Sequence, residues 1–318
     1  MIQGPGSDMA RLYTRRAMRS TARFLGGGQR RLERLLAPAG TALTPFVPDV
    51  QTAHTSEFKD CPCVFVLSTG RVGTETLAAL LAQSPAVYSV HEPRPALLPV
   101  TYEAYMSRGE DDRWVDVLRA ARGEAVASAC ARGQVYSETN PRMTFVASEL
   151  AKAFPASKFI HLHRHPYQVI YSCMRRGHYR GHPGDYARIH PRPDDPYYAN
   201  WDSMTTLEKV AWNWAESNSI ALDFMEKLPP DRRLNLSSNE LFNGSDATLR
   251  RLFGFVGVEV PGAVHSRDVL ESQLNRQVGG VPVDRPEKWS YDEKRAVNAI
   301  VGDAARALGY ELALEHIA

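Results

Sequence analysis

The sequence predicts an α/β protein in which a central parallel β-sheet lies between two layers of helices, a three-layer α/β/α arrangement. The first observation is the apolar run VFVL at 64–67, which is typical of a strand buried on both faces of a parallel sheet. The second is that strand-like runs alternate along the chain with stretches of helical periodicity, the order that βαβ units produce. The third is that helix-start signals directly follow strand candidates, with Pro141 after Asn140 and Pro166 after His165.

Each strand candidate is a short run rich in apolar residues and bounded by turn-forming residues. The run at 206–228 has helical spacing and predicts a helix that buries Trp212 or Trp214 in the core. A capping box, Ser290-x-x-Glu293, predicts the start of a final helix that Gly309 ends. The strand candidates lie at 64–68, 87–90, 135–137, 158–163 and 233–236.

The segment 178–200 has no clean periodicity and is dense in Gly, Pro, Tyr and His. A connection of this length in a compact domain is usually a lid or a binding loop. Its histidines and tyrosines suit recognition of a polar or aromatic acceptor, and the alternative is a disordered lid that makes no contact with the acceptor.

The composition sets the limits of the fold and of its partners. A length of 318 residues suits two domains or one α/β domain with an appendage, and we expect an arm and linker at 1–60 and one domain at 61–318. The 38 basic and 36 acidic residues give a formal charge of +2, which argues against general nucleic-acid binding. Four scattered cysteines and the lack of a long apolar window indicate a reduced, cytoplasmic protein.

The N-terminal arm is strongly basic. Eight arginines and one acidic residue lie between Arg11 and Arg34, with leucines interleaved. We favour a solvated arm or a lid that packs on the domain, and the alternative is an anchor for a membrane surface or an acidic partner.

The small residues that follow the strand-like run at 64–67 predict an anion-binding turn. Such a strand-to-helix turn leaves backbone N–H groups at the helix start pointing outward, with the positive end of the helix dipole behind them. Gly70 and Gly73 permit close approach of the backbone, and Arg71 adds fixed positive charge. Neither G-x-x-x-x-G-K-[ST] nor G-x-G-x-x-G is present, and taken alone the turn is equally well read as an ordinary one. Hydroxyl donors come from Ser68, Thr69 and Thr74.

A second cluster follows another strand candidate. Arg164 comes at the strand end, Pro166 opens a helix, and that helix carries Ser172 and Arg176 four residues apart on one face. Two guanidinium groups and a hydroxyl can converge on one dianionic group. The sequence therefore predicts two anion sites that follow two different strands.

The paired motifs resemble those of sulfotransferases that use 3′-phosphoadenosine 5′-phosphosulfate (PAPS), which have a P-loop-NTPase-like fold. Residues 71–74 resemble the family's [K/R]-x-G-[S/T]-T loop for the 5′-phosphosulfate, and Arg164, Pro166 and Ser172 match its R-x-P-x-x-x-x-x-S segment for the 3′-phosphate. The EKWSYDEKRAVNAIVGDAARALGYEL end resembles the family's closing Lys-Trp segment and last helix. The resemblance implies donor binding by Ser68, Thr69, Gly70, Arg71, Val72, Gly73, Thr74, Glu75, Thr76, Arg164, Ser172, Arg176, Lys288 and Trp289.

Three segments depart from the family pattern. Glu75 stands where the family has a second hydroxyl residue, so its carboxylate must turn away from the phosphate or pair with Arg71, and Thr76 replaces part of the lost hydroxyl function. LNLSSNEL at 234–241 replaces a common Tyr-Glu pair, and SETNP at 137–141 replaces a common Lys-Thr-Pro.

The candidate catalytic residues follow the strand at 87–90. Glu92 comes at the strand end, 21 residues after Arg71. This spacing resembles that of the catalytic Glu in the tyrosylprotein sulfotransferase branch and of a Glu-Pro pair in carbohydrate sulfotransferases. We expect Glu92 to be the general base, Arg71 to stabilise developing charge, and His91 to be the alternative base. The competing interpretation is that His91 and Glu92 only cap the following segment.

The resemblance implies an enzyme that moves a sulfuryl group from PAPS to a hydroxyl of a small molecule, lipid or carbohydrate, releasing 3′-phosphoadenosine 5′-phosphate (PAP), without a metal. His161, His163 and His165 alternate along one strand, but without a clear carboxylate or thiolate partner they are a weak metal signal. The alternatives are a nucleotide-binding protein of the same fold that has lost catalysis and, less favoured, a P-loop kinase.

Overall fold

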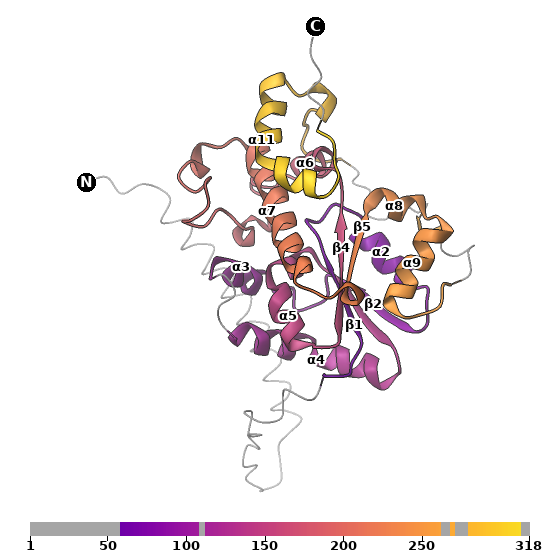
Figure 1. Ribbon diagram of the computed structural model, residues 1–318. Coiled ribbons are helices and arrows are strands. Elements are labelled where there is room, and N and C mark those ends of the chain that lie inside the picture. Colours follow the sequence, from indigo (N-terminus) through magenta and orange to yellow (C-terminus); the bar gives the residue numbers. More distant parts are fainter. Residues whose placement is uncertain (1–57, 108–111, 262–267, 271–278, 313–318) are drawn as a thin grey trace, which may run out of the picture. The chain divides into compact units, whose positions relative to one another are not determined.

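The computed structural model describes residues 58–107, 112–261, 268–270 and 279–312 (Figure 1). Within these residues five parallel strands form one sheet in the order β2-β3-β1-β4-β5. The predicted α/β class and the parallel sheet are confirmed, and each strand lies within two residues of its predicted bounds. The predicted arm and most of its linker lie outside the described residues. The strands are β1 (Cys63–Leu67), β2 (Val87–His91), β3 (Val135–Thr139), β4 (Ser157–His163) and β5 (Arg233–Ser237).

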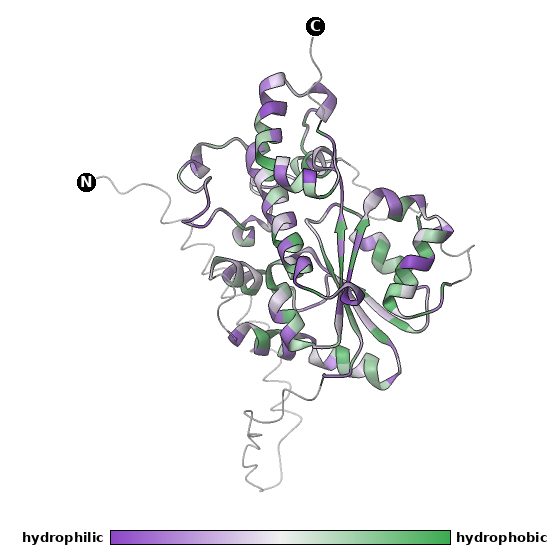
Figure 2. Ribbon diagram, viewed as in Figure 1, coloured by the Kyte–Doolittle hydropathy of each residue, from purple (hydrophilic) through white to green (hydrophobic). Residues whose placement is uncertain are grey.

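Side chains of β1 point alternately into two hydrophobic cores, one on each face of the sheet. Val64 and Val66 belong to the core shared with α2 (Thr74–Leu81), α6 (Pro166–Arg175), α9 (Asp246–Val256) and α11 (Tyr291–Ala307). Phe65 and Leu67 belong to the core shared with α4 (Arg113–Ala131) and α5 (Ala147–Ala153). Helices therefore cover both faces, as predicted, and Figure 2 shows apolar and polar residues alternating along them, as expected of helices with one buried side.

The long helix α7 (Thr206–Glu226) contributes to both cores. Its capping box pairs Thr205 with Glu208, and the predicted core tryptophans Trp212 and Trp214 are 2% and 1% exposed. The predicted box of Ser290 and Glu293 likewise starts α11. None of the helices within the described residues is both long and apolar enough to cross a membrane. The remaining elements are α3 (Leu98–Met106), α8 (Ser238–Asn243), η1 (Pro141–Val146), η2 (Asp185–Ala187), η3 (Trp201–Ser203), η4 (Pro230–Arg232) and η5 (Pro286–Lys288), where η marks a 3-10 helix.

Two helix boundaries differ from the prediction. Pro141 opens the 3-10 helix η1, with α5 following directly, rather than an α-helix. Arg176 is not inside α6 but caps it, because the Arg176 N–H donates to the carbonyls of both Ser172 and Cys173 and tightens the last turn. Gly177 then takes a left-handed φ of 73° and ends the helix. Arg176 still lies beside Ser172, but as a cap residue.

The 178–200 segment packs on the domain through its own small core. Ile189 is fully buried in a cluster with Tyr105 of α3 and Trp212 of α7. The Trp201 ring meets the rings of Tyr179 and Trp212 edge-on at 5.4 and 5.1 Å. The Tyr179 hydroxyl donates to the Ile189 carbonyl at 2.6 Å. These contacts give the segment a defined packed conformation, unlike the disordered lid considered as the alternative.

Candidate active site

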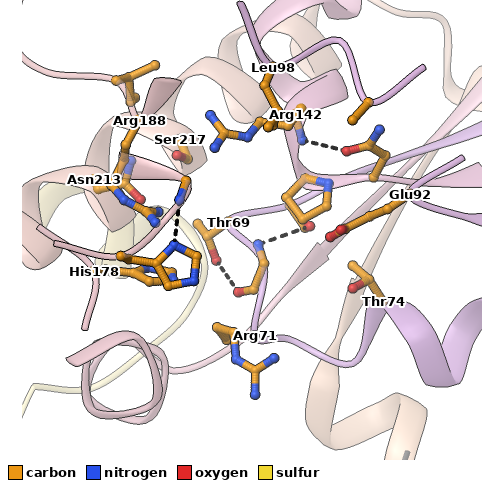
Figure 3. Close-up of a pocket in the computed structure, with 18 of the residues that line it drawn as sticks. Thr69, Arg71, Thr74, Glu92, Leu98, Arg142, His178, Arg188, Asn213 and Ser217 are labelled. Carbon is orange, nitrogen blue, oxygen red and sulfur yellow. Dashed lines mark hydrogen bonds between the residues drawn. The ribbon is translucent and has the colours of Figure 1, made fainter. Parts of the chain in front are cut away.

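A cavity of about 650 Å³ opens where β1, β2 and β3 end (Figure 3). In parallel sheets this edge is where ligands bind, because loops and helix starts converge there. The cavity takes residues from the β1–α2 loop, the segment after β2, the start of η1, the 178–200 segment and α7. The residues that line the cavity include Ser68, Thr69, Gly70, Arg71, Thr74, His91, Glu92, Arg94, Arg142, Arg176, His178, His182, Tyr186, Arg188, Asn213 and Ser217.

The β1–α2 loop turns its backbone outward. Gly70, Arg71 and Gly73 all have left-handed φ values of 75°, 61° and 101°. A Cβ added at Gly73 would lie 3.0 Å from the Phe242 ring, so the position has little room for a side chain. No side chain of the described residues caps the first N–H groups of α2. The loop therefore presents free backbone donors at a helix start, the arrangement that binds a phosphate.

Ser68 and Ser238 hold this loop in place. The Ser68 N–H donates to the Thr144 hydroxyl at 2.9 Å, and that hydroxyl donates to the Ser68 carbonyl at 3.0 Å. The Gly70 N–H donates to the Ser68 hydroxyl at 3.2 Å. Ser238, within the 234–241 segment that departs from the family pattern, donates to the Val72 carbonyl. This serine supports the loop from the β5–α8 side.

The two predicted anion motifs meet. The Arg71 Nε donates to the Ser172 hydroxyl at 3.1 Å, and Arg164 Nη1 donates to the Arg71 carbonyl at 3.4 Å. The contact is possible because β1 and β4, which lead into the two motifs, are neighbours in the sheet. Burial lowers the pKa of Arg71, and the charges of Arg176 and Arg164 lower it further. Arg164 and Arg176 are therefore close enough to Arg71 for their charges to interact with it, and Arg71 itself contacts Ser172.

Glu75 and Thr76 occupy the first turn of α2. Thr76 is buried and Glu75 is half-buried. The negative charge of Glu75 raises the pKa of Arg71, opposite to the effect of the neighbouring arginines. Its negative charge also suits the positive end of the helix. Glu75 is not among the residues that line the cavity, and its carboxylate instead offsets the positive charge of Arg71.

His91 and Glu92 lie side by side at the end of β2. The His91 Nδ1 lies 3.0 Å from the Thr139 carbonyl oxygen and 2.8 Å from the Thr139 hydroxyl, within hydrogen-bonding distance of both. These contacts orient the ring so that its other nitrogen, Nε2, lies 3.9 Å from Glu92 Oε1. Glu92 has a left-handed φ of 42° and its side chain is 60% exposed in the cavity. Both candidate bases therefore reach the same space.

A buried ion pair fixes the segment that carries Glu92. Arg122 of α4 donates to both carboxylate oxygens of Glu138, at 2.7 and 3.1 Å, and to the Pro95 carbonyl at 3.1 Å. The Asn140 amide also donates to Glu138, at 3.1 Å, while its oxygen accepts from the Arg142 N–H. One buried carboxylate thus connects the segment after β2 to the start of η1.

Several residues that line the cavity had no role predicted from the sequence. Arg142 follows β3 as Arg164 follows β4, and that repeat of strand end and arginine is the signal that could have identified it. Burial and Arg188 lower the pKa of Arg142 to about 10. His178 is one of the histidines of the 178–200 segment expected to take part in acceptor recognition, and it lines the cavity with His182, whereas His190 does not. Burial, together with the charges of Arg188 and its neighbours, lowers the pKa of His178 to about 2, so its ring is neutral. No sequence pattern marks Arg188, Asn213 or Ser217, which come from the long segment and α7.

Some predicted residues lie outside the cavity. Val72 is buried under the loop, and Lys288 is exposed. Trp289 is 6% exposed, meets the Tyr167 ring of α6 at 5.3 Å, and donates to the Asp284 carbonyl at 3.2 Å. It packs on α6, the helix that carries Ser172. Among the described residues, no group of three or more His, Cys, Asp or Glu side chains is arranged to hold a metal ion. His161 and His163 instead bond to Asn218 and Tyr310.

Comparison with solved structures finds sulfotransferases at low sequence identity. A sulfotransferase domain from the curacin biosynthetic pathway is 18% identical, with a TM-score of 0.47 over 80% of this chain and 100% of that one. A sulfotransferase from Alicyclobacillus acidocaldarius is 13% identical, with a TM-score of 0.47 over 79% of this chain and 97% of that one. A mouse sulfotransferase complexed with PAP is 13% identical, with a TM-score of 0.43 over 80% of this chain and 93% of that one.

Among curated proteins none is similar enough in sequence to count as a relative. The profile of one family, described as the sulfotransferase family, matches residues 62–262. That range begins just before β1 and includes the loop of Arg71, the candidate bases and the segment of Arg164 and Ser172. It covers well over half of the chain, and the chain therefore belongs to the sulfotransferase family.

Proposed function

We propose that the protein transfers the sulfuryl group of PAPS to the hydroxyl of an acceptor by in-line displacement. The observation that carries this proposal is the contact between Arg71 and Ser172, with Arg164 bonded to the same loop. It brings the phosphosulfate-type loop and the 3′-phosphate-type segment to one place, as a donor with phosphates at both ends requires.

The described residues suit the two ends of this donor. Backbone N–H groups at the start of α2, the close approach allowed by Gly70 and Gly73, and the Arg71 guanidinium suit the 5′-phosphosulfate. Arg164, Ser172 and Arg176 suit the 3′-phosphate, since two guanidinium groups and a hydroxyl match its dianionic charge.

The reaction forms a bond from the acceptor oxygen to sulfur and breaks the bond from sulfur to the 5′-phosphate oxygen. Glu92 takes the proton of the acceptor hydroxyl, and Arg71 with the loop amides stabilises the charge that develops on the departing phosphate. Positioning and electrostatics carry most of the rate enhancement in the related phosphoryl transfers, which need no covalent intermediate. The contact of His91 Nδ1 with Thr139 holds the Nε2 of His91 near Glu92.

Transfer of label from PAPS carrying sulfur-35 to a panel of hydroxyl compounds tests the proposal. We expect release of PAP with labelled product in the presence of an acceptor. Tight PAP binding without any transfer would favour the non-catalytic alternative, whereas binding of adenosine triphosphate with magnesium and none of PAP would favour a kinase.

A further inference from the structure

The cavity holds a second group of basic side chains that the proposed donor site does not use. Arg142 comes from the start of η1 and Arg188 from the 178–200 segment. Figure 3 shows both side chains across the cavity from Arg71. We call this pair, Arg142 and Arg188, the distal arginine pair.

The distal arginine pair forms a separate electrostatic group. The cations that lower the pKa of Arg71 are Arg176 and Arg164, whereas the cation that lowers the pKa of Arg142 is Arg188. Figure 3 shows His178 between Arg71 and Arg188, and the charges of both arginines lower its pKa. The cavity therefore has two positive ends with a neutral imidazole between them.

Contacts within the protein fix both arginines of the pair. Arg142 donates to the Ala187 carbonyl, which ties its side chain to the 178–200 segment. Arg188 forms an ion pair with Asp185 at 2.8 Å and lies over the Tyr179 ring. Asp185 also accepts from the N–H groups of Gly181 and His182, so its charge is shared. Asp185 therefore offsets part of the charge of Arg188, whereas Arg142 is held by a neutral carbonyl.

The charge of the cavity is strongly positive. Of the described residues that line it, five are arginines and one, Glu92, is a carboxylate. Glu92 is close enough to Arg142 to raise its pKa, but the proposed reaction needs this carboxylate for the acceptor proton. Half-buried cations are costly unless an anion meets them. The donor's phosphosulfate accounts for the charge at Arg71. It leaves Arg142, which is held by the neutral Ala187 carbonyl, and the part of the Arg188 charge that Asp185 does not offset.

We propose that the acceptor carries an anionic group, a carboxylate, phosphate or sulfate, next to the hydroxyl that is sulfated, and that the distal arginine pair binds it. This inference rests on the proposed function. Arg142 and Glu92 line the same cavity, so a group bound by Arg142 would lie in the space that holds the hydroxyl Glu92 deprotonates. The planar guanidinium donors of Arg142 and Arg188 suit a carboxylate or phosphate better than a neutral sugar or sterol.

Inorganic phosphate titrated calorimetrically into PAP-saturated protein tests this site without a known acceptor. We expect saturable binding that weakens by about tenfold or more in Arg142→Gln and Arg188→Gln, because each removes charge-assisted hydrogen bonds. Arg142→Lys should lose less, since it keeps the charge. The control Arg306→Gln removes an exposed arginine on α11 that pairs with Asp303, and should leave phosphate affinity unchanged.

Three results would overturn the inference. They are no phosphate binding to the PAP-saturated protein, phosphate binding that neither distal variant weakens, and a tenfold loss of PAP affinity in Arg142→Gln, which would assign Arg142 to the donor. Failure of the wild-type protein to bind PAP would instead contradict the proposed function. Phosphate titrated without PAP would then still show whether the pair binds an anion.

A matched acceptor pair gives a second readout. Label transfer to 2-hydroxyphenylacetate, whose carboxylate lies beside the hydroxyl, should exceed transfer to the neutral 2-hydroxyphenylacetamide by about tenfold in kcat/KM, and Arg142→Gln should remove the difference. Preference for the amide would contradict the inference. The phosphate titration decides alone if neither compound reacts.

Discussion

Arg71 and Ser172 are 101 residues apart in the chain and are joined by a hydrogen bond of 3.1 Å from the Arg71 Nε to the serine hydroxyl. The bond links the loop after β1 to the helix after β4, two elements whose strands are adjacent in the sheet. It brings the two predicted anion motifs side by side. The proposed donor site depends on this relationship.

Glu92→Gln should lower turnover by about 100-fold while leaving PAP affinity unchanged, because the amide keeps the shape of the side chain but cannot take a proton. Single-turnover transfer and PAP calorimetry measure the two effects. His91→Gln is the matched variant, and we expect a smaller loss of turnover. A larger loss in His91→Gln than in Glu92→Gln would assign the base to the imidazole.

Gly73→Ala should destabilise the protein and weaken PAP binding. Gly73 has a φ of 101°, and an added Cβ would lie 3.0 Å from the Phe242 ring, so both backbone strain and crowding fall on the donor loop. We expect a loss of about 1–3 kcal/mol in the free energy of unfolding. Gly254→Ala in α9 is the control, because nothing lies within 4 Å of an added Cβ there and alanine favours a helix. Equal effects at the two glycines would contradict the account of the loop.

Glu138→Gln should be strongly destabilising, because it leaves the Arg122 guanidinium as a buried charge without a carboxylate. Both side chains are at most 1% exposed, and breaking such a pair typically costs about 3–5 kcal/mol. The exposed pair of Asp303 and Arg306 is the control, and Asp303→Asn should change the free energy of unfolding by less than about 1 kcal/mol. Urea unfolding measures the free energy of unfolding of both variants. If Glu138→Gln changes it as little as Asp303→Asn does, the buried ion pair does not hold the segment after β2 and the start of η1 together.

Stability should fall as the solution is acidified below pH 6.5. Burial lowers the pKa of His161 from 6.5 to about 3 and that of His163 to about 4. Above pH 6.5 both rings are neutral in the folded and unfolded chains, so they cause no loss of stability. Between pH 6.5 and about 4 the unfolded chain binds protons that the folded protein excludes, so the free energy of unfolding decreases.

Urea unfolding between pH 7 and 4 checks this prediction. His163→Gln should reduce the slope of stability against pH in that window, although loss of the bond to Tyr310 will also lower stability at pH 7. The variant His190→Gln changes a histidine of the 178–200 segment and serves as the control. If stability falls as steeply with decreasing pH in His163→Gln as in the wild-type protein, His163 is not a source of this pH dependence.

Features set by neighbouring residues were predictable from the sequence. The apolar run of β1, the glycines of its loop and the start of α2 lie within a few residues, and so do Arg164, Pro166 and Ser172. Local backbone preferences and strand patterns determine such units, because each needs little from the rest of the chain. The exact end of α6 was not predictable, since it depends on the left-handed turn at Gly177.

Long-range contacts were not predictable in the same way. Arg142 reaches the cavity because Asn140 and Glu138 hold the start of η1, and Arg188 reaches it because Ile189 and Trp201 pack the long segment against α3 and α7. Arg142 has only the weak signal of an arginine after a strand end, and Arg188 has no periodic or motif signal. The basic character of the distal side of the cavity therefore emerged only from the structure.

Calorimetric titration of PAP into the wild-type protein, Arg71→Gln and Arg164→Gln tests the central claim most directly. The account predicts binding to the wild type and a loss of affinity of about tenfold or more in each variant, with Arg306→Gln unchanged, because each substitution removes charge from one end of the donor site. PAP binding that both site variants retain at full strength, or the absence of PAP binding to folded wild-type protein, would contradict it.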